Sequence, residues 1–265
     1  MLNRIVAEKR QEVAECKAIT PLASITDGLR PGESAFAKAL RRSDWSLIAE
    51  CKLASPAKGR LCSSHTVPEL ARLYTENGAT ALSVHTSRQF CGLLADIAAV
   101  RAVTGLPILR KDFIIDDYQL YETRRAGADA VLLIAAILTD EELIRFLAIA
   151  GQLGLDCLVE VHSRQELERV LQTGAELVGI NNRNLQTFVT DIGTTFTLLP
   201  DCDSRRLIIS ESGINSGREA ARLKEAGVRG ILVGEGLVTA GDIAGRVREL
   251  ARPDGTGECC TCDEK

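Results

Sequence analysis

Residues 126–161, AGADAVLLIAAILTDEELIRFLAIAGQLGLDCLVEV, contain two apolar runs separated by a helical pattern. The runs AGADAVLLI and GLDCLVEV are short and rich in Val, Leu and Ile, which is typical of buried strands. The helical pattern between them closes at Gly154, because glycine can take the left-handed conformation that ends a helix. A helix between two strands returns the chain to the same end of the sheet, so the two strands are predicted to be parallel.

The same strand and helix unit recurs along the chain. Apolar runs follow a glycine at positions 78, 105, 127, 154, 174 and 227, and two further runs, at 47–49 and 206–210, lack that glycine. Eight such units over residues 46–250 predict an α/β fold, a closed (β/α)8 TIM barrel. A doubly wound open sheet is the alternative, but it often has a glycine-rich fingerprint after its first strand, whereas here that strand ends in charged residues.

The segments outside the barrel are predicted to be an extension and a tail. Residues 1–45 contain helical patterns at 2–17 and 33–42, and we expect this N-terminal helical extension to pack on the barrel, because 45 residues rarely sustain their own core. Residues 251–265 are expected to be a flexible tail. Its thiols, Cys259, Cys260 and Cys262, have either no role or a role in soft-metal or thiol chemistry, although a fourth ligand is lacking nearby.

Composition excludes several classes of partner. The 265 residues carry a formal net charge of -4, and Lys and Arg are scattered, so there is no basic field for nucleic acid. No apolar run approaches the roughly 20 residues that span a bilayer, and the N-terminal segment lacks the apolar centre of a signal peptide. We therefore expect a globular protein in the cytoplasm, without nucleic-acid or membrane partners.

Polar and charged residues follow most of the predicted strands. In a (β/α)8 barrel the active site lies at the carboxyl ends of the strands, so these residues are predicted to share one mouth. A buried charge costs free energy unless a partner or a ligand compensates it, which favours catalysis over chance. Single pairs also permit plainer interpretations, namely salt bridges or helix caps. The residues are Glu50, Lys52, Lys111, Asp112, Glu160, His162, Asn181, Asn182, Arg183, Glu211, Ser212, Gly234 and Glu235.

Two glycine-containing segments, SESGI at 210–214 and LVGEGLV at 232–238, predict a phosphate site. This fold commonly holds a phosphate at a helix N-terminus after its seventh and eighth strands, and glycine lets the backbone approach the oxygens. The alternative is that the glycines only make tight turns. The predicted phosphate-binding residues are Arg183, Gly213, Gly234, Glu235, Ser55 and Lys52.

Taken together, the residues at the strand ends and the motifs around them resemble the indole-3-glycerol phosphate synthase family. The resemblance covers nearly the whole chain. The resemblance is specific because its motifs occur in the right order at barrel spacing. They are LNRIVAEKRQEV, FAKAL, IAECKLASPAKG, LRKDF, GADAVLLIAAIL, LVEVHS, GINNRNLQTF, SESGI and LVGEGLV.

The resemblance implies a carboxy-lyase of tryptophan biosynthesis. Its substrate would be 1-(2-carboxyphenylamino)-1-deoxyribulose 5-phosphate, which loses CO2 and water to give indole-3-glycerol phosphate. The family needs no metal and no organic cofactor. A phosphorylated small molecule is thus the expected partner, and contact with other tryptophan-pathway enzymes stays open.

The resemblance also implies roles for three residues. Lys111 is similar to the general acid that protonates the alkoxide formed during ring closure. Lys52 matches the lysine near the substrate carboxylate. Glu160 matches the carboxylate that transfers a proton in the dehydration half.

Four further residues would support these three. Glu50 would tune the charges of both lysines, Asn181 would hold a substrate hydroxyl or carboxylate, and Glu211 and Ser212 would orient the substrate. Clustered acids and lysines shift one another's pKa values, which is expected to help a lysine act as an acid near neutral pH.

The chain departs from the family pattern at SVHTSRQFCGLLADI, residues 83–97. His85 stands where the family has an apolar residue, Ser87 where it has an acid, and Leu93 where it has a serine. We expect His85 to be a variation at the barrel mouth rather than a catalytic base. The departures leave two alternatives open: a paralogous barrel acting on a related phosphorylated substrate, and a catalytically silent phosphate-binding partner protein.

Overall fold

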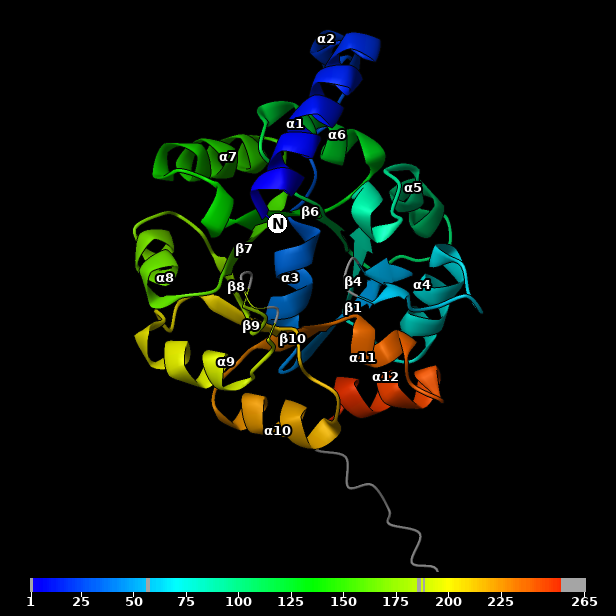
Figure 1. The fold of residues 1–265 in the computed structure, drawn as a ribbon, viewed down its shortest axis with the longest axis vertical. Helices are drawn as coiled ribbons and strands as arrows, with labels where there is room; N and C mark the ends of the chain where they lie inside the picture. Colours follow the sequence, from blue (N-terminus) through cyan, green and yellow to red (C-terminus); the bar gives the residue numbers. More distant parts are fainter. Residues whose placement is uncertain (1, 56–57, 185–186, 188, 254–265) are drawn as a thin grey trace, which may run out of the picture.

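Eight parallel strands close into a barrel in the computed structural model, which describes residues 2–55, 58–184, 187 and 189–253 (Figure 1). Strand β1 pairs with β10 on one side, where Ser46 lies opposite Gly230, and with β4 on the other. The predicted (β/α)8 barrel is therefore confirmed. The strands are β1 (Ser46–Cys51), β4 (Ala81–His85), β5 (Ile108–Lys111), β6 (Ala130–Ile134), β7 (Asp156–Val161), β8 (Leu177–Asn181), β9 (Leu207–Glu211) and β10 (Gly230–Val233).

Helices alternate with the strands and surround the barrel (Figure 1). Three of them begin with a reciprocal capping box, formed by Thr66 with Glu69, Thr139 with Glu142, and Ser216 with Glu219. The helices are α4 (Val67–Glu76), α5 (Ala95–Arg101), α6 (Asp117–Ala126), α7 (Asp140–Gln152), α8 (Arg164–Leu171), α9 (Gly193–Leu198), α10 (Gly217–Glu225), α11 (Glu235–Val238) and α12 (Ile243–Ala251). Shorter elements are β2 (Ala54–Ser55), β3 (Gly59–Arg60), η1 (Arg88–Phe90), η2 (Ala135–Ile137) and η3 (Leu199–Asp201).

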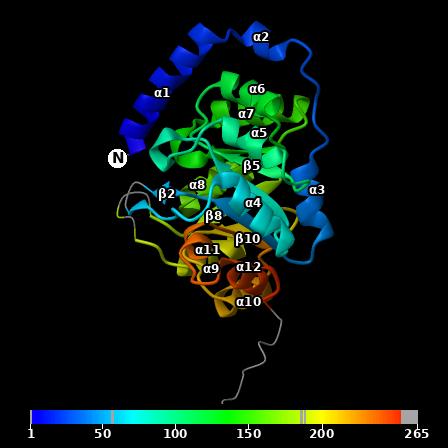
Figure 2. The same ribbon diagram turned by 90° about the vertical axis from the view of Figure 1, so that its right-hand side faces the viewer.

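Three helices precede the barrel. Helices α1 (Leu2–Ile19) and α3 (Ala35–Arg42) lie at the two predicted helical patterns, whereas α2 (Leu22–Thr26) falls in the joining segment and was not predicted. Figure 2 shows α1 and α3 on opposite sides of the barrel. Phe36 and Leu40 of α3 are fully buried in one cluster with the barrel residues Ile48 and Leu109, so α3 covers the barrel interior. The division at residue 45 stays a prediction.

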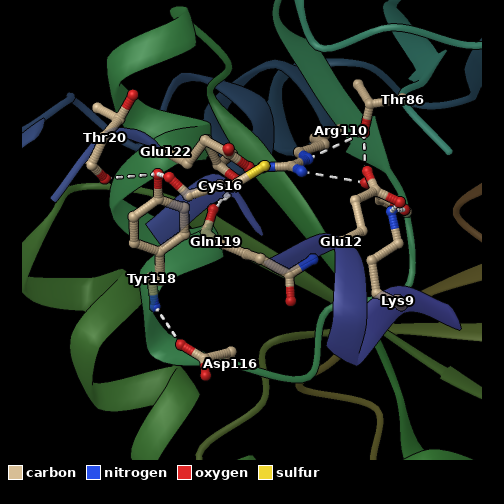
Figure 3. Close-up of polar contacts among 12 residues, drawn as sticks. Lys9, Glu12, Cys16, Thr20, Thr86, Arg110, Asp116, Tyr118, Gln119 and Glu122 are labelled. Atoms are coloured by element: carbon tan, nitrogen blue, oxygen red, sulfur yellow. Dashed lines mark hydrogen bonds and ion pairs between the residues drawn. The ribbon is translucent and has the colours of Figure 1, made fainter. Parts of the chain in front are cut away.

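Helix α1 is anchored by a buried ion-pair network on β5 and the residue after it (Figure 3). The Lys9 ammonium lies 2.9 Å from Asp112 Oδ1, and the Arg110 guanidinium lies 3.0 Å from Asp112 Oδ2. Arg110 also donates a hydrogen bond to Thr86 Oγ1. Asp112 therefore forms structural ion pairs with Lys9 and Arg110 rather than with its neighbour Lys111, and the helix cap that follows is Asp116. The network attaches α1 beside Lys111.

The cysteines of the barrel and extension are free. Cys51, Cys62 and Cys157 are buried, Cys16 and Cys202 are half-buried, and Cys91 is exposed. The thiols of the predicted tail lie outside the described residues. None of the described helices is both long and apolar enough to cross a membrane.

Candidate active site

A cavity of about 500 Å³ opens at the carboxyl ends of the barrel strands. Of the residues predicted to share the mouth or to bind phosphate, all line it except Ser55, His162 and Asn182. Asn182 is buried and accepts hydrogen bonds from Thr195 instead. Ser55 lies in β2, where its hydroxyl accepts a hydrogen bond from the backbone N–H of Lys58. The predicted residues that the structure brings to the cavity are Glu50, Lys52, Lys111, Glu160, Asn181, Arg183, Glu211, Ser212, Gly213, Gly234 and Glu235.

Lys111 lies between two carboxylates at the end of β5. Its Nζ is 2.7 Å from Glu160 Oε2 and 3.1 Å from Glu211 Oε2, and all three side chains are nearly buried. Burial alone would lower the pKa of Lys111, but Glu160, Glu211 and Glu50 outweigh it and raise that pKa. The cluster therefore keeps Lys111 charged. This corrects the expectation that clustering lowers the pKa of a lysine toward neutral pH. The carboxylates around Lys111 outnumber the other cations, so its pKa is raised instead.

The two carboxylates beside Lys111 have opposite pKa shifts. Burial, together with the neighbouring charge of Glu160, raises the pKa of Glu211 to about 8 in spite of Lys111. Burial disfavours the ionised form of Glu160 as well, but Lys111 and His162 lower its pKa well below the usual value. Two carboxylates that share one ammonium cannot both ionise easily, so Glu160 carries the charge and Glu211 keeps the proton at neutral pH.

Glu50 and Lys52 leave β1 on the same side, as alternation along a strand requires. The Lys52 ammonium is 3.5 Å from Glu50 Oε1, and the Glu50 side chain is buried. A Cβ at position 234 would lie 2.4 Å from the same carboxylate oxygen, so Gly234 leaves the space that Glu50 occupies. Burial would raise the pKa of Glu50, yet His85, Lys52 and Lys111 together lower it. Glu50 is therefore ionised inside the mouth.

The far end of the cavity has the features expected of an anion site. Ser212 and Gly213 both have left-handed backbone conformations, with φ of 67° and 77°, which a serine rarely adopts. Arg183 Nη2 lies 3.6 Å from Glu235 Oε2, and Lys58 also pairs with Glu235. Arg183 Nε is buried without a hydrogen-bond partner among the described residues.

Comparison with known proteins agrees with this geometry. A family model for indole-3-glycerol phosphate synthase matches residues 2–250. The chain belongs to the indole-3-glycerol phosphate synthase family. It is 45% identical over 263 residues to the indole-3-glycerol phosphate synthase of Desulforamulus reducens, covering 97% of this chain and 99% of that protein. The protein of the same name from Roseiflexus castenholzii is 48% identical over 263 residues, covering 94% of this chain and 97% of the relative.

Solved structures outside the indole-3-glycerol phosphate synthase family share the fold alone. Thiamine phosphate pyrophosphorylase from Pyrococcus furiosus aligns with a TM-score of 0.60 and 19% identity, over 80% of this chain and 96% of that one. The 3-hexulose-6-phosphate synthase from Salmonella typhimurium aligns with a TM-score of 0.63 and 16% identity, over 78% and 97%. The resemblance seen in the sequence is thus confirmed at the level of family and fold.

Sequence reasoning missed several residues that this member of the indole-3-glycerol phosphate synthase family places at the cavity. Lys58 lies inside the motif quoted for the resemblance, so the motif could have drawn attention to it. His162 was noted at a strand end without a role; it lies behind the cavity lining, where its Nε2 is 3.2 Å from Glu160 Oε1. Leu2 and Ile5 reach the cavity from α1. No local pattern could have shown that contact, because it depends on the tertiary packing of the extension.

Glycine 179 offers a test of the Glu211 position. A Cβ built at residue 179 would meet Glu211 Oε1 at 2.0 Å, which forces the carboxylate away from Lys111. We expect Gly179→Ala to lower kcat at least about tenfold, since small displacements of reacting groups cost large factors in rate. The matched control is Gly174→Ala, where no atom lies within 4 Å of the added Cβ. Equal activity of the two variants would show that Glu211 need not lie at Lys111.

The opposite pKa shifts of Glu211 and Glu160 predict opposite effects on stability. Glu211 has a folded-state pKa of about 8, above its unfolded value, so the folded state binds more protons and loses stability as pH rises toward 8. Glu211→Gln removes that loss, and its melting temperature should fall less than the wild-type value between pH 5.5 and pH 8.5.

Glu160→Gln is the counterpart of this measurement. The pKa of Glu160 is lowered on folding, so its ionised form stabilises the folded state at neutral pH, and the variant should melt below the wild type at pH 7. Thermal melts of both variants at several pH values decide the assignment. If Glu160→Gln shows the pH dependence expected of Glu211→Gln, and the reverse, then Glu211 is the ionised group and Glu160 the protonated one.

Proposed function

We propose that the protein is an indole-3-glycerol phosphate synthase that acts as a carboxy-lyase in tryptophan biosynthesis. Its substrate would be 1-(2-carboxyphenylamino)-1-deoxyribulose 5-phosphate, and its products indole-3-glycerol phosphate, CO2 and water. The observation that carries the proposal is the position of Lys111, a charged lysine held at the cavity between Glu160 and Glu211. The family membership of the chain supports the same reaction.

Ring closure joins the aromatic carbon that bears the carboxylate to the ketone carbon of the sugar chain. The ketone oxygen gains negative charge as this bond forms, and the Lys111 ammonium supplies a proton to it. Lys52 holds the substrate carboxylate by its charge. The bond to that carboxylate then breaks, CO2 leaves, and the electron pair restores the aromatic ring.

Dehydration completes the indole ring. The hydroxyl group leaves as water and a proton is lost from the new ring, so the step needs both a proton donor and a proton acceptor. Glu160 suits the acceptor role because its low pKa keeps it ionised at neutral pH. Glu50 tunes the lysine charges, Asn181 holds a substrate hydroxyl or carboxylate, and Glu211 and Ser212 orient the substrate.

The substrate phosphate would bind at the far end of the cavity, on the backbone of Gly213, Gly234 and Glu235. Glycines and the left-handed backbone at 212–213 allow N–H groups to point at an anion. The Arg183 guanidinium adds a charge-assisted contact, and its buried Nε is a donor without a partner among the described residues. The involvement of Ser55 and Lys52 with the phosphate, and of other tryptophan-pathway enzymes as partners, stays a prediction.

Lys111→Ala tests the proposal directly. Removing one group that stabilises developing charge costs about 10²–10³ in kcat in comparable sites, so the variant should lose at least that factor in the formation of indole-3-glycerol phosphate. The product is followed with the purified protein, and Lys38→Ala, an exposed lysine outside the cavity, serves as control. Near wild-type turnover of Lys111→Ala would refute Lys111 as the acid. If the wild-type protein lacks this activity, the proposal fails and two alternatives remain: a paralogous barrel that acts on a related substrate, or a catalytically silent partner protein.

Replacement of Arg183 should act on binding rather than on chemistry. The phosphate is remote from the reacting carbons and is held about equally in the ground and transition states, so Arg183→Ala should raise KM with little change in kcat. Steady-state kinetics with the same substrate separates the two constants. A variant with a lowered kcat and an unchanged KM would place Arg183 in the chemistry instead.

A further inference from the structure

His85, at the end of β4, is a cavity residue that the proposed reaction does not use. Its side chain is 7% exposed, and its Nε2 lies 3.2 Å from Glu50 Oε2. The other oxygen of the same carboxylate, Oε1, lies 3.5 Å from the Lys52 ammonium. Glu50 thus lies between an ammonium and an imidazole, each near a different oxygen.

A neighbouring aromatic ring fixes the orientation of His85. The imidazole stacks on Phe90 of η1, with ring centroids 4.3 Å apart and ring planes 11° apart. The Lys52 ammonium lies 5.2 Å from the centroid of the same Phe90 ring. One phenyl ring therefore contacts both groups that flank Glu50, which limits the rotamers available to His85.

The charges around His85 define its protonation state. Burial lowers the pKa of His85, the Glu50 carboxylate opposes this, and Lys52 and Lys111 lower it further. A neutral imidazole carries one N–H, and the adjacent carboxylate favours that proton on Nε2. Neither ring nitrogen makes a hydrogen bond of good geometry among the described residues, but Nε2 lies 3.2 Å from Glu50 Oε2. We therefore assign the single N–H to Nε2, the nitrogen that lies beside the carboxylate.

We propose that His85 is a positioning residue that holds Glu50 in place while the substrate carboxylate occupies Lys52. This inference rests on the proposed function, in which that carboxylate competes with Glu50 for the Lys52 ammonium. An N–H directed at Glu50 Oε2 compensates the buried carboxylate when Lys52 turns to the substrate. Glu50 then stays ionised and near Lys111. An apolar side chain, as the family pattern has at this position, has no such donor.

The proposal is tested by a double-mutant cycle of His85→Leu and Glu50→Gln, read out in the free energy of unfolding. Leucine is the kind of residue that the family pattern has here, so His85→Leu is expected to fold. If the imidazole contacts Glu50, the effects of the two substitutions are not additive. His85→Gln keeps a side-chain N–H donor and should retain part of the coupling. Additive effects in the cycle would overturn the contact.

The kinetic readout is the pH dependence of kcat with the synthase substrate. Loss of the donor raises the pKa of Glu50, so the acid limb of the profile should move upward by about 1 pH unit in His85→Leu and less in His85→Gln. Leu93→Ser is the control, because Leu93 is another departure in the same segment and is 61% exposed. Its profile should match that of the wild type.

The outcomes separate this inference from the proposed function. A wild-type protein that makes no indole-3-glycerol phosphate would overturn the proposed function, and the positioning role would fall with it. An active wild type whose acid limb coincides with that of His85→Leu would overturn only the role of His85. A shifted limb in His85→Leu, with partial recovery in His85→Gln, supports it.

Discussion

A buried ammonium shared by two carboxylates is the interaction on which the rest of the site depends. Lys111, Glu160 and Glu211 come from β5, β7 and β9, three strands that do not neighbour one another in the barrel. Only closure of the sheet brings their carboxyl ends to one point. Burial makes the charges of Lys111 and Glu160 costly alone, so these two groups stabilise each other, and the protonation states of all three groups are set jointly.

Glycines at two positions in the barrel leave space for these polar groups. Gly179 and Gly234 lie where a Cβ would collide with the carboxylates of Glu211 and Glu50. Apolar layers below them, with α3 packed against the barrel interior, supply the stability that offsets the buried charges. At the mouth, the Lys9 and Asp112 ion pair attaches α1 beside Lys111, so the extension contributes Leu2 and Ile5 to the cavity.

Much of the fold and the composition of the site could be predicted from the sequence, because both follow from repetition. Eight short apolar runs with polar endings predict parallel strands, and the barrel rule then gathers residues such as Glu50 and Glu160 at one mouth. Contacts between segments remote in sequence could not be predicted. The stacking of His85 on Phe90, the packing of α1 and the engagement of Ser55 by Lys58 depend on side-chain placement that no periodicity records. The direction of the Lys111 pKa shift could not be predicted either, because it depends on which charged groups surround Lys111 in the folded protein.

The most direct test of the carboxylate cluster is to measure the protonation state of Lys111. Nuclear magnetic resonance of protein labelled at lysine Nζ, with the Lys111 signal assigned by its absence in a Lys111 variant, follows the ammonium through a pH titration. We predict that Lys111 stays charged at pH values where a lysine with an ordinary pKa has lost its proton, because Glu160, Glu211 and Glu50 raise the pKa of Lys111. A Lys111 that loses its proton before the exposed lysines would contradict the central role of the carboxylate cluster.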